Sequence, residues 1–160
     1  RREHPGQLPH GRAGEDHRPE THLIPLTIDA ALGRRPALKL FGTDYPTRDG
    51  SCVRDYIHVT DLADAHVRAL SQIDHRSVTY NIGNGQGYSN LEVIQSVERV
   101  SGRKVPWEAA PRREGDPSLL VADSTTLRNE TGWTPRFGDL DSIVETALRW
   151  RESHPHGYEA

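Results

Sequence analysis

The stretch that decides the fold class runs Val78-Thr-Tyr-Asn-Ile82, then Gly83-Asn-Gly-Gln-Gly87, then a helical pattern that begins at Ser89. The first segment is apolar and rich in strand-forming residues, and the second is a glycine-rich turn. Ser89 and Glu92 have the spacing of a capping box, in which each side chain accepts a hydrogen bond from the other residue's backbone amide. The helix behind them is predicted to stop at Gly102. A strand, a tight turn and a helix in this order are typical of an α/β protein.

Strand and helix patterns alternate along the rest of the chain. Strands are predicted over 37–42, 53–59, 105–109 and 119–122, and helices over about 22–32, 61–71, 124–132 and 140–153. Thr21 and the pair Thr60-Asp61 are the expected N-caps of the first two helices. Residues 1–20 are rich in Pro, Gly and charge without periodicity, so we expect an irregular segment there and one domain over 21–160. We therefore expect an α/β fold with a largely parallel sheet.

The composition argues against several classes of protein. The chain has 160 residues, a formal net charge of −3 and one cysteine, Cys52. This charge does not suit a nucleic-acid-binding surface, which is basic. No apolar run approaches the ~18 residues that a membrane span needs. A lone cysteine cannot form an internal disulfide, so nothing indicates secretion. We expect a soluble cytoplasmic protein with neither nucleic acid nor membrane as partner.

Two familiar kinds of site are not supported by their spacing. The loop Gly83–Gly87 reads G-x-G-x-G, and Tyr88 stands where a dinucleotide-binding loop has its third glycine. A tight turn with positive φ is the better interpretation. The nine histidines include the pair His17 and His22, whose spacing matches no compact helical ligand pair. We therefore expect solvated histidines and no metal site.

Two arginine-containing segments are better candidates for a binding site. Arg54 lies within the predicted strand Val53–Val59, and the loop Pro111-Arg-Arg-Glu-Gly-Asp116 carries two guanidinium groups and a carboxylate. Guanidinium groups can bind a pyrophosphate through paired hydrogen bonds, and a carboxylate can accept from both hydroxyls of a ribose. Surface ion pairing is the simpler interpretation of the same residues. The residues alone leave both interpretations open.

At these segments the sequence resembles the C-terminal part of the UDP-glucose 4-epimerase family, which belongs to the extended short-chain dehydrogenase/reductases. The resemblance runs from about His10 to Tyr158 and rests on many short matches in order. They are His10–Asp16, Thr21–Pro25, Phe41–Pro46, Asp49–Gly50, Cys52–Val59, Asp61–Ala63, Tyr80–Gly83, Pro111–Asp116, Ala122–Ser124, Gly132–Trp133 and His154–Pro155. The fold it implies is the C-terminal substrate-binding lobe of an extended Rossmann-type protein, with the N-terminal dinucleotide-binding half absent.

The resemblance implies a site for a UDP-sugar. Its expected members are Thr21, His22 and Leu23 at the uridine nucleotide, Lys39, Leu40 and Phe41 along the uracil, Arg54 and Arg113 on the diphosphate, Asp116 on the ribose hydroxyls, and Leu120 at the sugar pocket. Leu120 stands where a bulky tyrosine in the family tends to exclude N-acetylated sugars. A leucine there is expected to admit them.

The resemblance also implies chemistry that this sequence lacks. The family uses NAD on a G-x-x-G-x-x-G loop and a catalytic Y-x-x-x-K pair, and neither pattern occurs here. The residues four places after Tyr45, Tyr56, Tyr80 and Tyr88 are Asp49, Thr60, Asn84 and Glu92. We therefore expect no catalytic and no NAD-binding residues in this chain, and no turnover by it alone. The family's homodimer interface is expected upstream of it.

Three alternatives stay open at this point. The first is another UDP-sugar 4-epimerase, acting on arabinose and xylose or on N-acetylhexosamines. The second is a non-catalytic module that binds nucleotide sugars. The third is the product of a damaged reading frame that does not fold. In the first two the same UDP-binding residues are used. Whatever the function, the helix predicted over 61–71 is expected to leave apolar side chains exposed, because it normally packs on the absent lobe.

Overall fold

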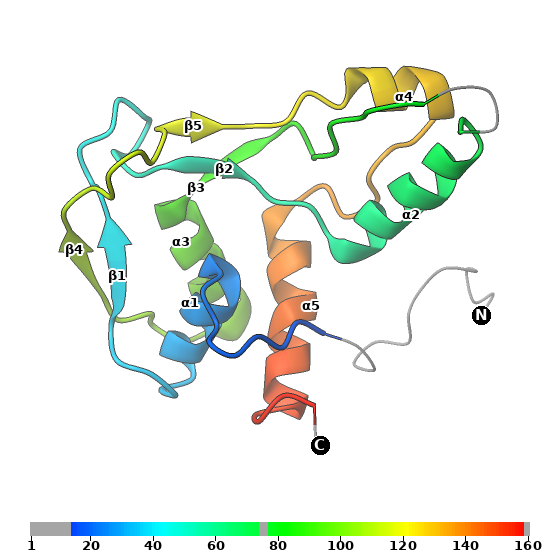
Figure 1. Cartoon of the computed structure of the whole chain (residues 1–160). Helices are drawn as coiled ribbons and strands as arrows, with labels where there is room; N and C mark the ends of the chain where they lie inside the picture. Colours follow the sequence, from blue (N-terminus) through cyan, green and yellow to red (C-terminus); the bar gives the residue numbers. More distant parts are fainter. Residues whose placement is uncertain (1–13, 74–76, 159–160) are drawn as a thin grey trace.

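The computed structural model describes residues 14–73 and 77–158. Within them helices and strands alternate in an α/β arrangement (Figure 1). In chain order the elements are α1 (Leu23–Ala31), β1 (Leu38–Phe41), β2 (Val53–Asp55), α2 (Val59–Leu70), β3 (Gly87–Ser89), α3 (Asn90–Ser101), β4 (Trp107–Ala110), β5 (Leu119–Leu120), α4 (Thr125–Thr131) and α5 (Leu140–Ser153). No helix of this described part is long and apolar enough to cross a membrane.

The main core lies between α1, α3 and α5, which stand next to one another in Figure 1. Ile28 of α1, Val97 of α3 and Val144 of α5 are fully buried there. Polar groups tie two of these helices together at the surface, because Asp141 of α5 accepts hydrogen bonds from Ser96 (2.6 Å) and Arg99 (2.7 Å) of α3. The apolar periodicity of the three helices thus produces one shared core.

The strands form two small sheets and not the single, largely parallel sheet expected. In the first, β1 runs parallel to β4, with Leu38 opposite Trp107. In the second, β2 lies between β3, which is antiparallel to it, and β5, which is parallel. The connection from β1 to β2 turns at Gly42 and Gly50, both with positive φ. A side chain at Gly50 would meet the Thr43 carbonyl oxygen at 2.2 Å. This folded connection places the two strands in separate sheets.

Two strand predictions were wrong in extent or place. The strand expected over 53–59 ends at Asp55, and α2 begins at Val59, because Nδ1 of His58 accepts a hydrogen bond from the Thr60 amide (3.1 Å). His58 is therefore the N-cap, in place of the expected Thr60-Asp61. The segment 78–82 is irregular, although it was expected to form a strand, and β3 follows it at Gly87. Its apolar residues contribute to packing without joining a sheet.

The predicted boundaries of α3 are confirmed. The capping box of Ser89 and Glu92 is present in both directions, and α3 ends at Gly102 in the left-handed conformation. The expected positive φ in the glycine loop occurs at Gly85 (76°). One cap was wrong: α1 begins after His22 and not Thr21, and no side chain of the cap residue bonds to the helix.

A second, smaller core joins α2 to α4. Ala65, Leu127 and Trp133 are fully buried in it. Beside it lies the carboxylate of Asp61, which is 1% exposed and accepts hydrogen bonds from the backbone amides of Arg136 (3.0 Å) and Phe137 (2.9 Å). This carboxylate therefore holds the segment before α5 against α2.

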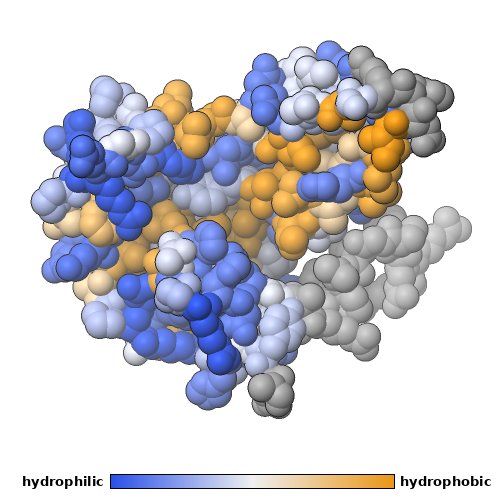
Figure 2. All heavy atoms as spheres, in the orientation of Figure 1, coloured by the Kyte–Doolittle hydropathy of each residue, from blue (hydrophilic) through white to orange (hydrophobic). Residues whose placement is uncertain are grey.

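One face of α2 carries exposed apolar side chains. They form the orange surface at the right of Figure 2, over the part of Figure 1 where α2 lies. Val59, Val67, Leu70 and Ile73 are each more than half exposed. An apolar stripe of this size on one helix is unusual for a self-contained surface. The expectation of an exposed apolar face on this helix is confirmed.

Replacing Asp61 by alanine is expected to destabilise the fold strongly. The backbone amides of Arg136 and Phe137 would lose their carboxylate acceptor, and a hydrogen bond to a charged group is worth about 1.5–3 kcal/mol. We therefore expect the free energy of unfolding in urea to fall by roughly 2–4 kcal/mol. The control is Asp64→Ala, which breaks the ion pairs of this side chain with Arg68 (2.8 Å) and Arg136 (3.8 Å) but leaves the two amide hydrogen bonds of Asp61 in place, and it should cost less than about 1 kcal/mol. Equal effects of both variants would contradict this assignment.

Acid is expected to loosen the contact between α3 and α5. The hydrogen bond from Arg99, together with that from Ser96, holds the pKa of Asp141 below its ordinary value. A carboxylate whose pKa is lower when folded stabilises the protein above its unfolded pKa, and this stabilisation is lost as the pH falls through the folded pKa. Unfolding of Asp141→Asn, compared with the unchanged chain, should therefore show a shallower loss of stability below about pH 4. Parallel pH profiles would refute this role.

Candidate functional site

The candidate site forms where the carboxyl ends of two parallel strands meet. Phe41, the last residue of β1, is opposite Ala110, the last residue of β4, and the Gly42 amide donates to the Ala110 carbonyl (2.9 Å). Parallel strands present their carboxyl ends at the same edge of a sheet. The chain that follows β4 is the predicted loop Pro111–Asp116. The register therefore brings this loop beside Phe41.

The two arginines of the loop have different surroundings. The Arg113 guanidinium lies over the Phe41 ring, 4.0 Å from its centroid. Arg112 instead donates to Asp44 (Nε to Oδ1, 2.7 Å) and stacks on Tyr45 at 4.2 Å. The hydrogen bond from Arg112 holds the pKa of Asp44 below its ordinary value, so this carboxylate stays charged. Arg112 thus anchors the loop. The one described contact of the Arg113 guanidinium is its stacking on Phe41.

The second half of the site is an ion pair between β2 and the end of the loop. The Arg54 guanidinium donates to Oδ1 of Asp116, and both side chains are about three-quarters buried. The other carboxylate oxygen of Asp116 lies 3.7 Å from the Cys52 thiol. The Asp116 amide donates to the Arg113 carbonyl (3.3 Å). This backbone turn connects the ion pair to the stacked arginine.

The structure therefore places Arg54, Arg113 and Asp116 in one region. Leu120 belongs to the same place, because it is paired with Arg54 across β2 and β5 and is 60% exposed. Phe41 adds an aromatic ring beneath Arg113. Two cations, one carboxylate, a ring and an exposed apolar side chain form a surface that suits an anionic, partly aromatic ligand.

The neighbours of Phe41 in β1 contribute unequally. Lys39 is exposed, whereas the Leu40 side chain is 1% exposed and faces the core, as alternation along a strand requires. Of these two residues only Lys39 can reach a ligand with its side chain. Leu40 can contribute only backbone atoms.

The predicted residues Thr21, His22 and Leu23 lie at the start of α1. The side chain of His22 is engaged there: its Nδ1 lies 2.9 Å from Oε1 of Glu20 and 3.0 Å from Oε1 of Glu15. The Glu20 carboxylate also accepts from the Thr21 amide (2.8 Å). The described hydrogen bonds and ion pairs of His22 thus join it to acidic side chains and not to the group around Arg54.

Sequence reasoning missed several members of these two places. Cys52 and Tyr45 line the ion pair: Tyr45 is 6% exposed, and burial, with the Cys52 thiol, raises its pKa. Tyr45 lies within Phe41–Pro46, one of the stretches that carry the family resemblance. This stretch is the sequence feature from which its place in the site could have been predicted. Burial likewise raises the pKa of Tyr56 to about 12. A phenol with a raised pKa does not suit a general base near neutral pH.

The glycine loop does not fit a dinucleotide. The amides of Asn84 and Gly85, which a pyrophosphate would need, both donate to the Asp55 carboxylate at 3.0 Å. A side chain at Gly83 would approach Asp55 Oδ2 at 2.4 Å. These glycines serve close packing inside the fold. We derive no step through NAD from the residues present.

Comparison with known proteins gives one consistent result. Residues 9–83 match the model of the NAD dependent epimerase/dehydratase family. A UDP-glucose 4-epimerase of Lacticaseibacillus casei is 48% identical over 155 residues, which are 96% of this chain and 47% of that protein. A crystal structure of a UDP-glucose 4-epimerase superposes with a TM-score of 0.90 at 47% identity, covering 97% of this chain and 48% of the other.

A further solved structure is a complex with nucleotide ligands. The UDP-glucose 4-epimerase of Bifidobacterium longum, in complex with NAD+ and UDP, superposes with a TM-score of 0.81 at 39% identity. It is matched over 86% of this chain and 41% of its own. The chain thus spans about half the length of the curated relatives it matches. These matches identify it as a homologue of the C-terminal part of UDP-glucose 4-epimerases, within the NAD dependent epimerase/dehydratase family.

Proposed function

We propose that this chain is the UDP-sugar-binding part of a protein that interconverts UDP-glucose and UDP-galactose by epimerisation at C4. The observation that carries the proposal is the meeting of Arg54, Arg113 and Asp116 beside Phe41. The relatives' names point to the same nucleotide sugars. We also propose that the whole protein is a homodimer and that it is located in the cytoplasm.

Each group has a role that follows from its chemistry. Arg54 and Arg113 bind the diphosphate, because planar guanidinium groups pair with phosphate oxygens. Asp116 accepts hydrogen bonds from the ribose hydroxyls. Phe41 and the exposed Lys39 flank the uracil, with the backbone of Leu40 between them. The nucleotide-binding surface is completed at the start of α1 by Thr21, His22 and Leu23. They contribute mainly backbone atoms, because the His22 side chain already contacts Glu15 and Glu20.

The ligand must compete with the ion pair that exists without it. Arg54 and Asp116 satisfy each other, yet neither is fully buried. Each side chain keeps about a quarter of its surface exposed, so a ligand can reach both. A diphosphate offers negatively charged oxygens to Arg54 and leaves Asp116 free for the ribose hydroxyls. The pair keeps both side chains oriented in the absence of nucleotide.

Catalysis belongs to residues outside this sequence. A Y-x-x-x-K pair and a G-x-x-G-x-x-G loop are absent from the printed chain, and the raised pKa of Tyr45 removes it as a base. We propose that the chain binds UDP but does not turn over UDP-glucose by itself, with NAD held by the preceding half of the whole protein. A non-catalytic nucleotide-sugar module is the alternative, and it requires the same affinity for UDP.

A second candidate activity concerns the sugar. Leu120 is 60% exposed next to Arg54 in the sheet register, so a larger side chain there would narrow the space beside the diphosphate. Leucine at this position favours acceptance of N-acetylated sugars, and we propose UDP-N-acetylglucosamine as an additional substrate of the whole protein. The arabinose and xylose nucleotides are smaller, and Leu120 does not select against them.

Removing the Arg113 side chain is expected to weaken UDP binding. The lost charge-assisted hydrogen bonds are worth about 1.5–3 kcal/mol, or roughly tenfold or more in affinity. Calorimetric titration of UDP into the chain and into Arg113→Ala measures this loss. The control is Arg103→Ala, an exposed arginine beyond α3, which should leave the dissociation constant unchanged. Equal heats for the unchanged chain and Arg113→Ala would refute the nucleotide site.

Enlarging Leu120 is expected to discriminate between sugars. Leu120→Tyr should lower the affinity for UDP-N-acetylglucosamine relative to UDP-glucose by roughly tenfold. A substrate group that no longer fits its pocket loses about 1–3 kcal/mol of binding free energy. Its neighbour Leu119 is equally exposed but alternates to the other face of β5, so Leu119→Tyr is the control. The measurement is the ratio of the two dissociation constants. An unchanged ratio in Leu120→Tyr would remove Leu120 from the sugar pocket.

A further inference from the structure

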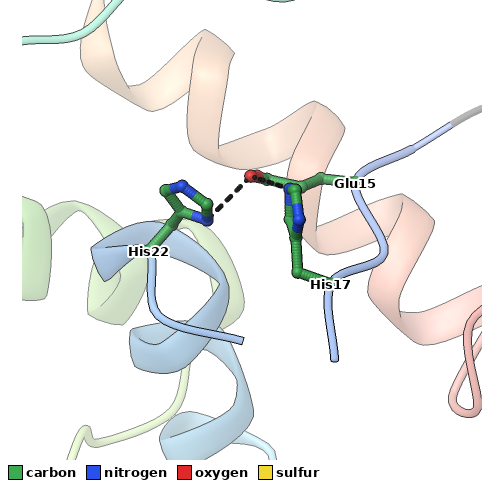
Figure 3. A group of neighbouring side chains, drawn as sticks. All are labelled: Glu15, His17 and His22. Carbon is green, nitrogen blue, oxygen red and sulfur yellow. Dashed lines mark ion pairs between the residues drawn. The ribbon is translucent and has the colours of Figure 1, made fainter. Parts of the chain in front are cut away.

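Three side chains with metal-binding atoms meet just before α1. In Figure 3 the rings of His17 and His22 turn toward the carboxylate of Glu15. Nε2 of His17 and Nδ1 of His22 each lie 3.0 Å from Oε1 of Glu15. One ligand atom from each of the three residues lies within 4.8 Å of the others. Two imidazole nitrogens and a carboxylate oxygen are a donor set that zinc and similar divalent ions accept.

A second carboxylate adjoins this group and is incompletely satisfied. Oε1 of Glu20 lies 2.9 Å from Nδ1 of His22 and accepts from the Thr21 and His22 amides (2.8 and 2.9 Å). The Glu20 side chain is only 10% exposed, and its Oε2 is buried without a hydrogen-bond partner among the described residues. A buried carboxylate oxygen without a partner is costly. A cation bound at His22 would lower that cost.

Hydrogen bonds alone serve this group poorly. Nδ1 of His22 faces two carboxylate oxygens, at 3.0 and 2.9 Å, but one N–H can donate well to only one of them. Two donors bound to one tetrahedral zinc ion at about 2.1 Å lie about 3.4 Å apart. The two nitrogen–oxygen distances of 3.0 Å therefore need to widen by only a few tenths of an ångström to admit an ion. The two nitrogens, which lie within 4.8 Å of each other, need to reach the same spacing.

We propose that Glu15, His17 and His22 bind a divalent transition-metal ion of the zinc type, with Glu20 beside it. The three side chains are 44%, 51% and 55% exposed, so an ion reaches them without unfolding the segment. Three protein ligands leave one position for water. The bound ion ties the irregular segment before α1 to the start of that helix. This site goes beyond nucleotide binding and is independent of Arg113.

Zinc binding to the full chain tests the proposal. Competition with a chromophoric chelator should show about one equivalent of Zn²⁺ bound, and Co²⁺ should show the intense visible bands of a tetrahedral site. His17→Ala, His22→Ala and Glu15→Gln should each weaken Zn²⁺ by roughly tenfold or more, the loss that disturbing even an outer-shell partner causes. Mg²⁺, which prefers all-oxygen sites, should not compete.

The controls separate this site from unspecific binding by other histidines. His66→Ala, an exposed histidine on α2, and the double variant His4→Ala, His10→Ala should keep the affinity of the unchanged chain. The proposal is wrong if no saturable Zn²⁺ binding occurs, if the variants at 17 and 22 bind as tightly as the chain, or if a control loses as much. Circular dichroism verifies that every variant is folded. Loss of UDP binding in Arg113→Ala with Zn²⁺ affinity intact would support a metal site that does not depend on the diphosphate-binding residues, whereas loss of both would contradict it.

Discussion

The carboxylate of Asp55 is the interaction on which the rest of this structure depends. It accepts hydrogen bonds from the amides of Asn84 and Gly85 at 3.0 Å and of Ala122 at 3.2 Å. Two segments far from β2 in the sequence, at Asn84–Gly85 and at Ala122, are thereby fixed at its end. Because neighbours on a strand alternate, the preceding Arg54 points away from this junction. Asp55, which holds the fold together, and Arg54, the candidate ligand-binding residue, are thus neighbours whose side chains point to opposite faces of β2.

Features of the fold that depend on a few neighbouring residues were predictable from the sequence. The capping box at Ser89 and the left-handed end of α3 at Gly102 follow from the chemistry of the residues themselves. The arrangement of the strands was not predictable in this way. Segment 78–82 has a strand-like composition, yet it forms no sheet, since Asp55 takes up the amides that follow it. Pairing is decided by partners that a local pattern does not contain.

The sequence left two interpretations of the arginine-rich loop open, and its two arginines have surroundings that suit different ones. Arg112 forms an ion pair with Asp44 and stacks on Tyr45, which is the structural interpretation. Arg113, one residue later, stacks on Phe41 and has no carboxylate partner among its described contacts. Adjacent residues in an extended loop point in different directions, so one arginine can anchor the loop while the next serves a ligand. Only the resemblance to a family indicated the ligand's identity.

The histidine and glutamate group before α1 was missed for a physical reason. Spacing rules for metal ligands describe regular helices, where fixed intervals place side chains on one face. Glu15, His17 and Glu20 lie in an irregular segment whose turns set their directions one by one, and only His22 adjoins a helix. Such a segment pays conformational entropy for bringing the ligands together, with few apolar contacts to offset it. The proposed ion would supply this stabilisation, and for this reason a convergent arrangement of exposed donors in a loop argues for a ligand more strongly than the same residues on a helix would.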